Sequence, residues 1–314
     1  ISSDGHAGKA VVGVRLLGGL LLRERFFCIG CAFFLTETGA CGKILQQSLF
    51  SAIGAVDAEE GAKRTMKQLV FQGVGTALMT PFQADGLDLD AFRKLIRFQL
   101  ANEVDALIVA GTTGEGAVLT AAEFDALLSC ALEEADGKTP VIAGTGSNDT
   151  ARAVEKTKRA CAMGADAVLL VTPYYNKTTQ RGLAAHFRAI ADASEKPCIL
   201  YNVPSRTGLN MLPETLEQLC DHPRIAGVKE ACGNLSQVAR IRYLCGEDMP
   251  IYSGCDDQTV PIMSLGGLGV ISVASNVVPG QMKNLCRLFQ AGSVAEAGTL
   301  QTRMQGFLDQ LMIE

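Results

Sequence analysis

Short apolar runs alternate with longer amphipathic stretches along most of this chain. The runs begin roughly 20 to 35 residues apart, which is the size of one strand-and-helix unit. Each run is continuously apolar, as expected for strands that are covered by protein on both faces. Eight such runs predict strands at Gly73–Met79, Ala106–Ala110, Pro140–Ala143, Ala167–Val171, Cys198–Tyr201, Ile225–Val228, Ile251–Ser253 and Gly269–Val273.

The stretches between the runs have helical periodicity. One is Leu89–Asn102, and another is Thr150–Met163, which Asn148 and Asp149 precede as candidate N-caps. Strand–helix alternation implies a parallel sheet with helices outside, and eight units favour a closed barrel over an open, doubly wound sheet. The predicted fold is therefore an α/β protein, a (β/α)8 TIM barrel with the start of a C-terminal helical extension.

The two ends of the chain depart from this pattern. Residues 1–65 contain two apolar stretches, but charged residues interrupt them before they reach the ~20 residues that a membrane helix needs. We expect an appended leader over residues 1–65, poorly ordered or peripheral, and no membrane partner. The catalytic (β/α)8 barrel is expected over residues 66–282, and residues 283–314 are expected to form a truncated C-terminal helical region.

Composition narrows the classes of partner and cofactor. A net charge of -5 over 314 residues gives no sign of a surface for nucleic acid or an anionic membrane. The eleven cysteines are odd in number and lie mostly in apolar runs, which indicates free thiols and a reducing cytoplasm. With three histidines and no His-x-x-x-His pair, we expect no metal site, and we expect no cofactor.

The reactive groups are expected at the carboxyl ends of the strands, where barrels of this kind hold their active sites. Lys229 directly follows the apolar run Ile225–Val228, whereas the other eleven lysines lie in polar or helical surroundings or in the leader, where a solvated ammonium is the norm. A buried amine is partly neutral near pH 7 and can attack a ketone. A structural lysine paired with Glu230 is the alternative, but adjacent strand residues point to opposite faces. We therefore predict that Lys229 forms a Schiff base.

Other polar residues follow the same strand ends. Tyr201, Thr112 and Tyr175 could form the hydroxyl relay that imine chemistry requires, although each phenol alone is equally consistent with an ordinary core tyrosine. The Gly111–Gly114 loop has small residues that let backbone N–H groups approach a carboxylate, and it lacks the Gly-Lys-Ser/Thr ending of a nucleotide P-loop. Arg206 could hold a second carboxylate, or be a surface arginine.

These segments together resemble the dihydrodipicolinate synthase / N-acetylneuraminate lyase family of class I lyases. The resemblance covers about Phe71 to Glu314. Four motifs carry it, in order: Gly-Thr-Thr-Gly-Glu (111–115), Val-Thr-Pro-Tyr-Tyr-Asn (171–176), Tyr-Asn-Val-Pro-Ser-Arg-Thr-Gly (201–208) and Gly-Val-Lys-Glu-Ala (227–231). Four matches in register are a specific signal.

The resemblance implies catalytic roles for four residues. Lys229 would form an imine with pyruvate, and Tyr201 and Thr112 would belong to the proton relay. Tyr175 would complete the relay by reaching in from the neighbouring subunit of a homotetramer.

It also implies how the substrates are held. The Thr113 backbone would bind the pyruvate carboxylate, while Gly254 and Ile271 would line the pocket. Arg206 stands in Pro-Ser-Arg-Thr-Gly, which favours the family members that condense pyruvate with aspartate 4-semialdehyde in the diaminopimelate route to lysine. The enamine would attack the aldehyde, and cyclisation would release Lys229.

Two other functions stay open on the sequence. One is another pyruvate-dependent aldolase of the same family, such as an N-acetylneuraminate or 2-keto-3-deoxy-sugar-acid lyase, which would share Lys229. The other is a non-catalytic barrel that binds a keto acid as a sensor, against which the full set of lysine, tyrosines and threonine argues.

The chain departs from the family at the lysine-feedback site that some members possess. That site uses a Tyr, an Asn, two His and a Glu. Tyr174 and Asn148 match here, but the histidine positions read Ala121 and Phe124, and the acidic position reads Arg152. An arginine repels the ammonium that should bind there, so we expect lysine to inhibit weakly or not at all.

Overall fold

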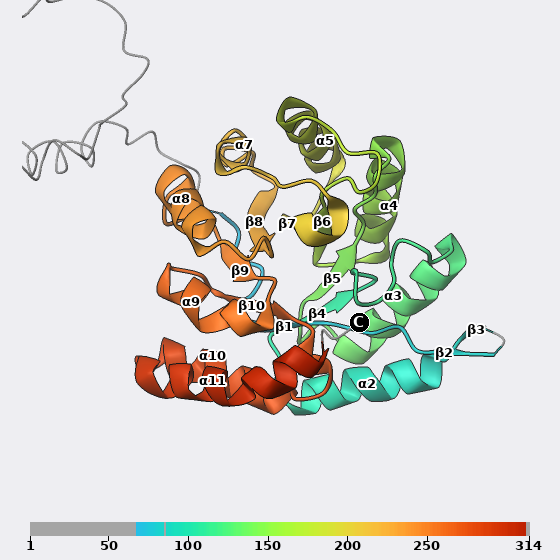
Figure 1. Ribbon diagram of the computed structural model, residues 1–314. Coiled ribbons are helices and arrows are strands. Elements are labelled where there is room, and N and C mark those ends of the chain that lie inside the picture. Colours follow the sequence, from blue (N-terminus) through green and yellow to red (C-terminus); the bar gives the residue numbers. More distant parts are fainter. Residues whose placement is uncertain (1–66, 85, 312–314) are drawn as a thin grey trace, which may run out of the picture. The chain divides into compact units, whose positions relative to one another are not determined.

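In the computed structural model, which describes residues 67–84 and 86–311, eight parallel strands close into a barrel surrounded by helices (Figure 1). Their order around the barrel is β1-β10-β9-β8-β7-β6-β5-β4. The strands are β1 (Gly73–Ala77), β4 (Ala106–Val109), β5 (Val141–Gly144), β6 (Ala167–Val171), β7 (Cys198–Asn202), β8 (Ile225–Glu230), β9 (Ile251–Ser253) and β10 (Gly269–Ser272). They coincide with the eight predicted apolar runs, so the predicted TIM barrel is confirmed.

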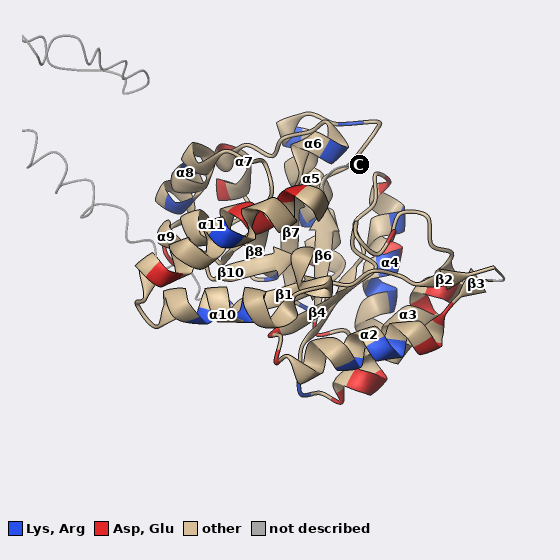
Figure 2. Ribbon diagram, turned by 60° about the horizontal axis from the view of Figure 1, so that its bottom comes forward, with Lys and Arg blue, Asp and Glu red and all other residues tan. Residues whose placement is uncertain are grey.

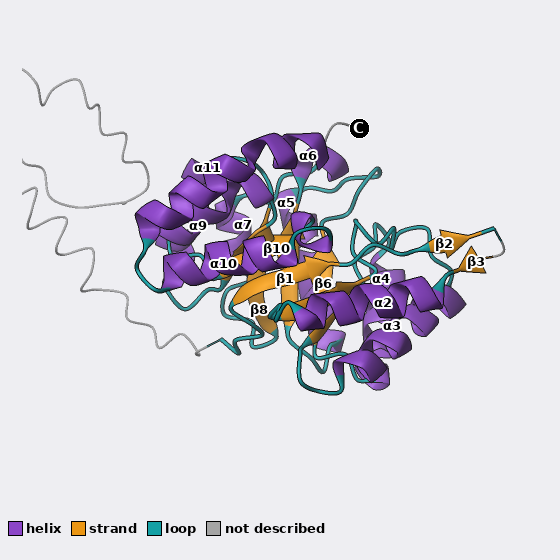
Figure 3. Ribbon diagram, turned by 90° about the horizontal axis from the view of Figure 1, so that it is seen from below, coloured by secondary structure: helices purple, strands orange, loops and turns teal. Residues whose placement is uncertain are grey.

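Helices follow the strands and form the outer layer (Figure 3). The longer ones are α2 (Leu89–Ala101), α3 (Ala121–Ala135), α4 (Thr150–Met163), α5 (Gln180–Ala193), α8 (Leu235–Cys245), α10 (Pro279–Gln290) and α11 (Val294–Leu311). The shorter ones are α6 (Pro204–Thr207), α7 (Pro213–Glu217), η2 (Asp256–Gln258), α9 (Thr259–Ser264) and η3 (Ala274–Asn276). A small hairpin of β2 (Phe82–Gln83) and β3 (Gly86–Leu87) follows β1.

Helix α4 shows how local sequence sets the element boundaries. It spans the predicted residues, and the Asp149 side chain caps it by accepting hydrogen bonds from the backbone N–H groups of Ala151 and Arg152 at 2.9 and 3.3 Å. Asn148, the other candidate, lies one residue before this cap. At the far end Gly164 adopts a left-handed conformation (φ 101°), which glycine does without steric cost.

Apolar side chains fill two layers of the barrel. Residues such as Val228 and Leu200 pack between the strands and the surrounding helices. A separate cluster that includes Ile142, Tyr252 and Ile271 fills the interior of the barrel. The two clusters reflect the alternation of side chains along each strand, which sends successive residues to opposite faces.

Strand β8 carries a bulge that decides which of its side chains face inward. The pairing of β7 with β8 shifts register by one residue at Ala226. Ile225 and Val228 consequently both pack in the outer layer, although they are three positions apart. Lys229 then points into the barrel, where its ammonium lies over the ring of the interior residue Tyr201.

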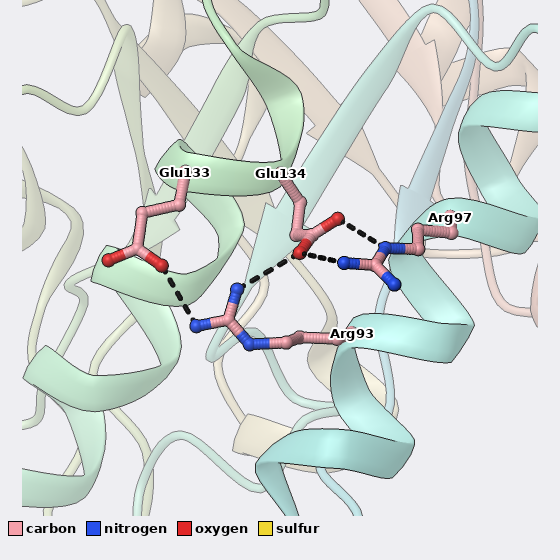
Figure 4. A network of polar contacts seen from close by, with 4 residues as sticks. All are labelled: Arg93, Arg97, Glu133 and Glu134. Carbon is pink, nitrogen blue, oxygen red and sulfur yellow. Dashed lines mark hydrogen bonds and ion pairs between the residues drawn. The ribbon is translucent and has the colours of Figure 1, made fainter.

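Ion pairs join α2 to α3 on the outside of the barrel (Figure 4). Arg93 contacts Glu133 at 2.8 Å and Glu134 at 2.9 Å, and Arg97 contacts Glu134 at 2.7 Å. The two guanidinium groups lower the pKa of the Glu134 carboxyl, Arg97 more than Arg93. These pairs link the two helices at the edge of the molecule, where each contributes little stability individually.

The C-terminal helices α10 and α11 pack against each other (Figure 1) and enclose an apolar cluster with α9 and β1. The boundary expected between residues 282 and 283 falls inside α10, which is continuous across it. Gln301 of α11 donates from Nε2 to the Asp256 carbonyl at 2.9 Å and accepts from the Val260 N–H at 3.2 Å. Helix α11 is thereby tied to η2 and α9, which follow β9.

Two expectations concern the ends of the chain. The leader expected at residues 1–65 lies outside the described residues. Within residues 67–84 and 86–311, no helix is long and apolar enough to cross a membrane.

Candidate active site

A cavity of about 350 Å³ lies at the carboxyl ends of strands β4 to β7. It is the size of a site for a small organic ligand. Its lining includes four of the polar residues that the sequence singles out, namely Thr112, Tyr174, Tyr201 and Arg206. In the part of the chain that the structure describes, no cluster of His, Cys, Asp and Glu side chains could hold a metal ion. This cavity is the candidate active site.

Lys229 lies next to the cavity, inside the barrel. In the sheet register it stands between Tyr201 of β7 and Tyr252 of β9. Its Nζ is 4.4 Å from the centroid of the Tyr201 ring, and the residue is 4% exposed. Because Tyr201 lines the cavity and also contacts Lys229, it connects the lysine to the space where a substrate would bind.

Burial lowers the pKa of Lys229 to about 8, and the charge of Asp256 opposes this shift. Among the described residues, Lys229 forms no ion pair and donates no hydrogen bond; its cation–π contact is with Tyr201. At pH 7 an amine with this pKa is neutral in roughly a tenth of the molecules, about 300 times the fraction at its ordinary pKa. The site thus holds a buried amine that is partly neutral and has no ion-pair partner among the described residues. The neutral amine is the form that reacts with a carbonyl group.

Glu230, the neighbour of Lys229, has its own partners on the opposite face of β8. Its carboxylate accepts hydrogen bonds from Asn202 at 3.0 and 3.1 Å, from Gln237 at 3.3 Å and from the Cys232 N–H at 2.8 Å. These groups belong to the sheet–helix layer and not to the barrel interior. The structure therefore agrees with the expectation that Glu230 does not pair with Lys229.

The room beside Lys229 depends on Gly254. A Cβ atom at this position would come within 2.6 Å of the Ala231 Cβ and 3.1 Å of the Lys229 Cε. The Gly254 N–H donates to the Glu230 carbonyl at 2.8 Å, which fixes the loop against the strand. A side chain at residue 254 would press on the stem of the lysine.

Tyr201 and Arg206 give the cavity a proton donor and an anion-binding group. Burial raises the pKa of Tyr201 to about 12, partly offset by Arg206 and by a hydrogen bond with Thr112, so the phenol keeps its proton at neutral pH. Arg206 lies in the short helix α6 and lines the cavity. Its guanidinium has no hydrogen-bond or ion-pair partner among the described residues, which leaves its donors available to a ligand.

The remaining predicted site residues lie at different distances from this cavity. Thr112 lines it, whereas Thr113 does not, although both stand in the same loop. Ile271 is fully buried and shares the interior cluster with Tyr201. Tyr175 is 90% exposed and is not among the residues that line the cavity.

The prediction from sequence missed Asp256. Its Oδ2 accepts hydrogen bonds from the Val273 and Ala274 N–H groups, both at 3.0 Å, while its Oδ1 is shielded from solvent and has no partner in the described structure. Desolvation raises the pKa of this carboxyl; hydrogen bonds from Ser272, Ala274 and Val273 oppose the rise, and the charge of Lys229 opposes it by a smaller amount. Asp256 is thus the carboxylate that stabilises the charged form of the lysine.

Comparison with known proteins shows the family of the chain. Residues 70–314 match the model of the family described as "Dihydrodipicolinate synthetase family". The chain belongs to this family. A 4-hydroxy-tetrahydrodipicolinate synthase of Alkaliphilus oremlandii is 50% identical over 245 residues, which are 78% of this chain and 84% of that protein.

Solved structures of the dihydrodipicolinate synthetase family share the barrel. The dihydrodipicolinate synthase of Thermotoga maritima matches with a TM-score of 0.77 and 42% identity over 78% of this chain and 85% of that one. The enzyme from Cyanidioschyzon merolae, solved with lysine bound, matches with a TM-score of 0.76 and 42% identity over 79% of this chain and 85% of that one. The family resemblance stated from the sequence motifs is therefore confirmed.

Proposed function

We propose that this protein is a class I lyase that condenses pyruvate with aspartate 4-semialdehyde to 4-hydroxy-tetrahydrodipicolinate, in the diaminopimelate route to lysine. The observation that carries the proposal is Lys229, a buried amine without an ion-pair partner in the described structure, beside a cavity of about 350 Å³. The shared name of the curated relatives supports the same reaction. We assign catalysis to Lys229, Tyr201, Thr112 and Tyr175.

The first half of the reaction uses the neutral amine. Lys229 Nζ adds to C2 of pyruvate, the carbinolamine loses water, and an imine remains. Loss of a proton from C3 then gives an enamine. The Tyr201 phenol keeps its proton at neutral pH and can deliver it to the leaving hydroxyl, with Thr112 as the next hydroxyl of the relay.

The second half joins the two substrates. The enamine carbon attacks the aldehyde carbon of aspartate semialdehyde, and the amino group of that substrate displaces Lys229 from the imine carbon to close the ring. We assign the carboxylate of the semialdehyde to Arg206, and support for this comes from its place in the cavity lining and from the lack of a partner for its guanidinium among the described residues. We assign the pyruvate carboxylate to the Thr113 backbone, and the wall of the pocket to Gly254 and Ile271.

We further propose a homotetramer that works in the cytoplasm. The exposure of Tyr175 supports assembly, because a phenol that is 90% exposed can serve the relay only in a neighbouring subunit. Buried free thiols at Cys130, Cys161, Cys198 and Cys286 support a reducing compartment.

Lysine is expected to inhibit weakly or not at all. Arg152 lines a neighbouring cavity together with Tyr174 and Asn148, and its guanidinium repels a bound ammonium. The check is the initial rate at saturating pyruvate with increasing lysine. Inhibition at low lysine concentration would overturn this expectation.

The proposed chemistry is tested by trapping the imine. The full chain is incubated with pyruvate and sodium borohydride, digested, and searched by mass spectrometry for a reduced pyruvyl adduct. We expect the adduct on Lys229, and an adduct on another lysine or on none would refute the mechanism. Arg206→Ala separates the two substrates: trapping should continue, while the KM for aspartate semialdehyde should rise about tenfold or more with the loss of a charge-assisted pair.

A further inference from the structure

Glu230 is a charged residue in a part of the molecule that is otherwise almost free of charge. The charged residues of the described chain lie mainly on the helices and loops (Figure 2), and in its eight barrel strands only Lys229 and Glu230 are charged. Lys229 faces the barrel interior, whereas Glu230 faces the surrounding helices and is 1% exposed. A carboxylate buried in this way is costly unless hydrogen-bond donors surround it. The donors around Glu230 consequently indicate what it does.

Among the described residues, the Glu230 carboxylate meets donors alone. It accepts from the amide of Asn202 on β7, from the amide of Gln237 on α8 and from the Cys232 N–H. The backbone of Met211 fixes the direction of both amides. Asn202 Oδ1 accepts from the Met211 N–H at 2.8 Å, and Gln237 Nε2 donates to the Met211 carbonyl at 3.2 Å. If either amide turned over, a donor would face a donor or an acceptor would face an acceptor.

A side chain that only accepts hydrogen bonds is therefore required at residue 230. Burial raises the pKa of Glu230, and the hydrogen bonds from Cys232, Asn202 and Gln237 oppose the rise by favouring the ionised form. A glutamine at this position would turn an N–H group toward Asn202 or Gln237, each of which also donates. Two donors that face each other in a buried site are unfavourable, so the three amides could not keep their present arrangement.

The same two amides hold the loop 208–212, which follows α6. Asn210 Oδ1 accepts from Asn202 Nδ2 at 2.8 Å and from Gln237 Nε2 at 3.1 Å, and Asn210 Nδ2 donates to Gln237 Oε1 at 2.8 Å. These residues belong to no helix or strand, so side-chain contacts take the place of a backbone ladder. Arg206 is the charged residue of α6, and two residues separate this helix from Asn210. The position of Arg206 thus depends on this polar network.

Lys229 is held in a different way. Its strand β8 pairs with β7 on one side and with β9 on the other, and Lys229 stands opposite Tyr201 in the first pairing and opposite Tyr252 in the second. Backbone hydrogen bonds on both sides keep Lys229 and Tyr201 in place when a side-chain contact behind them is lost. Loss of the polar network should therefore displace Arg206 more than Lys229.

We propose that Glu230 is a positioning residue for Arg206. As the acceptor that both amides share, it fixes the loop 208–212 to β7 and β8 and so sets the position of the Arg206 guanidinium relative to the Lys229 amine. This inference rests on the proposed function, which assigns the carboxylate of aspartate semialdehyde to Arg206. A displaced guanidinium should weaken the binding of this second substrate and leave imine formation with pyruvate nearly unchanged.

The test compares Glu230→Gln with the wild-type chain in a condensation assay and in pyruvate trapping. The KM for aspartate semialdehyde should rise about tenfold, because small displacements of a substrate-binding group are costly. The rate of borohydride trapping with pyruvate should stay within about threefold, because Lys229 keeps its backbone ladder. Glu214→Gln makes the same chemical change at an exposed position of α7, and it should alter neither quantity more than about twofold.

A double-variant cycle separates positioning of Arg206 from a general loss of structure. In the Arg206→Ala background the guanidinium is absent, so adding Glu230→Gln should raise the KM for aspartate semialdehyde by less than about twofold. Equal effects of Glu230→Gln in the two backgrounds would overturn the proposal. An unchanged KM in the single variant would overturn it as well, and so would a fall in trapping as large as the fall in condensation.

Two further variants of the test cover its possible failures. If Glu230→Gln does not fold, Asn210→Ala removes the contact of the loop with both amides at a half-buried position, and the same cycle applies. If the wild-type chain condenses no semialdehyde, the proposed function is refuted, and crystal structures of the wild-type chain and Glu230→Gln decide the positioning. A shift of the Arg206 Cα relative to the Lys229 Cα by about 0.5 Å or more supports it, and a smaller shift overturns it.

Discussion

Lys229 of β8 and Lys156 of α4 have amines with the same lowered pKa, about 8, and the same leading cause, burial. Their surroundings differ. Lys156 has a carbonyl acceptor and a phenylalanine ring, which keep its ammonium in place. Lys229 donates no hydrogen bond within the described residues, and a phenol that retains its proton lies beside it. A lowered pKa alone therefore does not identify a nucleophile; the free lone pair and the nearby proton donor do.

The largest effect is expected from Lys229→Met. Loss of the nucleophile should lower the condensation rate by about a thousandfold or more and abolish borohydride trapping. The melting temperature should change little, because loss of the amine removes its desolvation cost but leaves the buried Asp256 carboxylate without the charge of Lys229. Lys158→Met serves as the control for removing a lysine. If the variant is still trapped, with the adduct on another lysine, the assignment of Lys229 and not Lys156 as the reactive amine is contradicted.

Gly254→Ala should have the next largest effect on the trapping rate, because the added methyl crowds Lys229 and not Lys156. The new methyl would meet the Ala231 Cβ at 2.6 Å and the Lys229 Cε at 3.1 Å. Displacement of the amine should slow trapping by roughly ten- to a hundredfold. Gly298→Ala, where an added methyl meets nothing within 4 Å, is the matched control and should leave trapping unchanged. If Gly254→Ala and Gly298→Ala are trapped at equal rates, the space beside Lys229 does not affect imine formation.

Asp256→Asn should shift a pH profile. The rate constant for trapping should rise with pH and level off above about pH 8, where Lys229 is mostly neutral. Asp256 favours the charged lysine, so its neutralisation should move the rise to lower pH. Asp257→Asn, at the exposed neighbouring position, is the comparison variant. If the pH profile of Asp256→Asn does not move, Asp256 does not influence the pKa of Lys229.

The smallest effect on trapping is expected from Lys156→Met. The pyruvyl adduct should remain on Lys229, with a rate within about tenfold of the wild-type value, because the amine that is lost touches the catalytic loop through one hydrogen bond. Peptide mass spectrometry and the trapping rate measure this together. Complete loss of the adduct in a folded variant would contradict the division of roles between the two lysines.

The barrel could be predicted from sequence because strands buried on both faces must be apolar throughout. Lys229 was found for the same reason: a lysine at the end of such a strand is an exception that needs a cause. Arg206 was identified by the motif around it, and its available guanidinium emerged only when the cavity was seen.

Asp256 and Lys156 could not be found in this way. Asp256 precedes another acidic residue in a polar segment, and nothing in the sequence tells which of the two carboxylates turns inward. Lys156 stands in the run Glu-Lys-Thr-Lys-Arg, which indicates a solvated helix face, whereas the structure half-buries this residue and its pKa is lowered to about 8 by burial. Its burial depends on the Gly116 loop and on α3, which are distant in the chain. Tertiary contacts, and not local pattern, decide both positions.

The bulge at Ala226 has a consequence for how this enzyme family can vary. Ile225 and Val228 face the same layer only because one unpaired residue lies in the pairing between β7 and β8. Without it, the alternation of the strand would place Glu230 in the barrel and Lys229 among the surrounding helices. The identity of the nucleophile is therefore specified by the number of residues in β8 as much as by their kind. Insertions and deletions that surface loops accept are excluded from this strand.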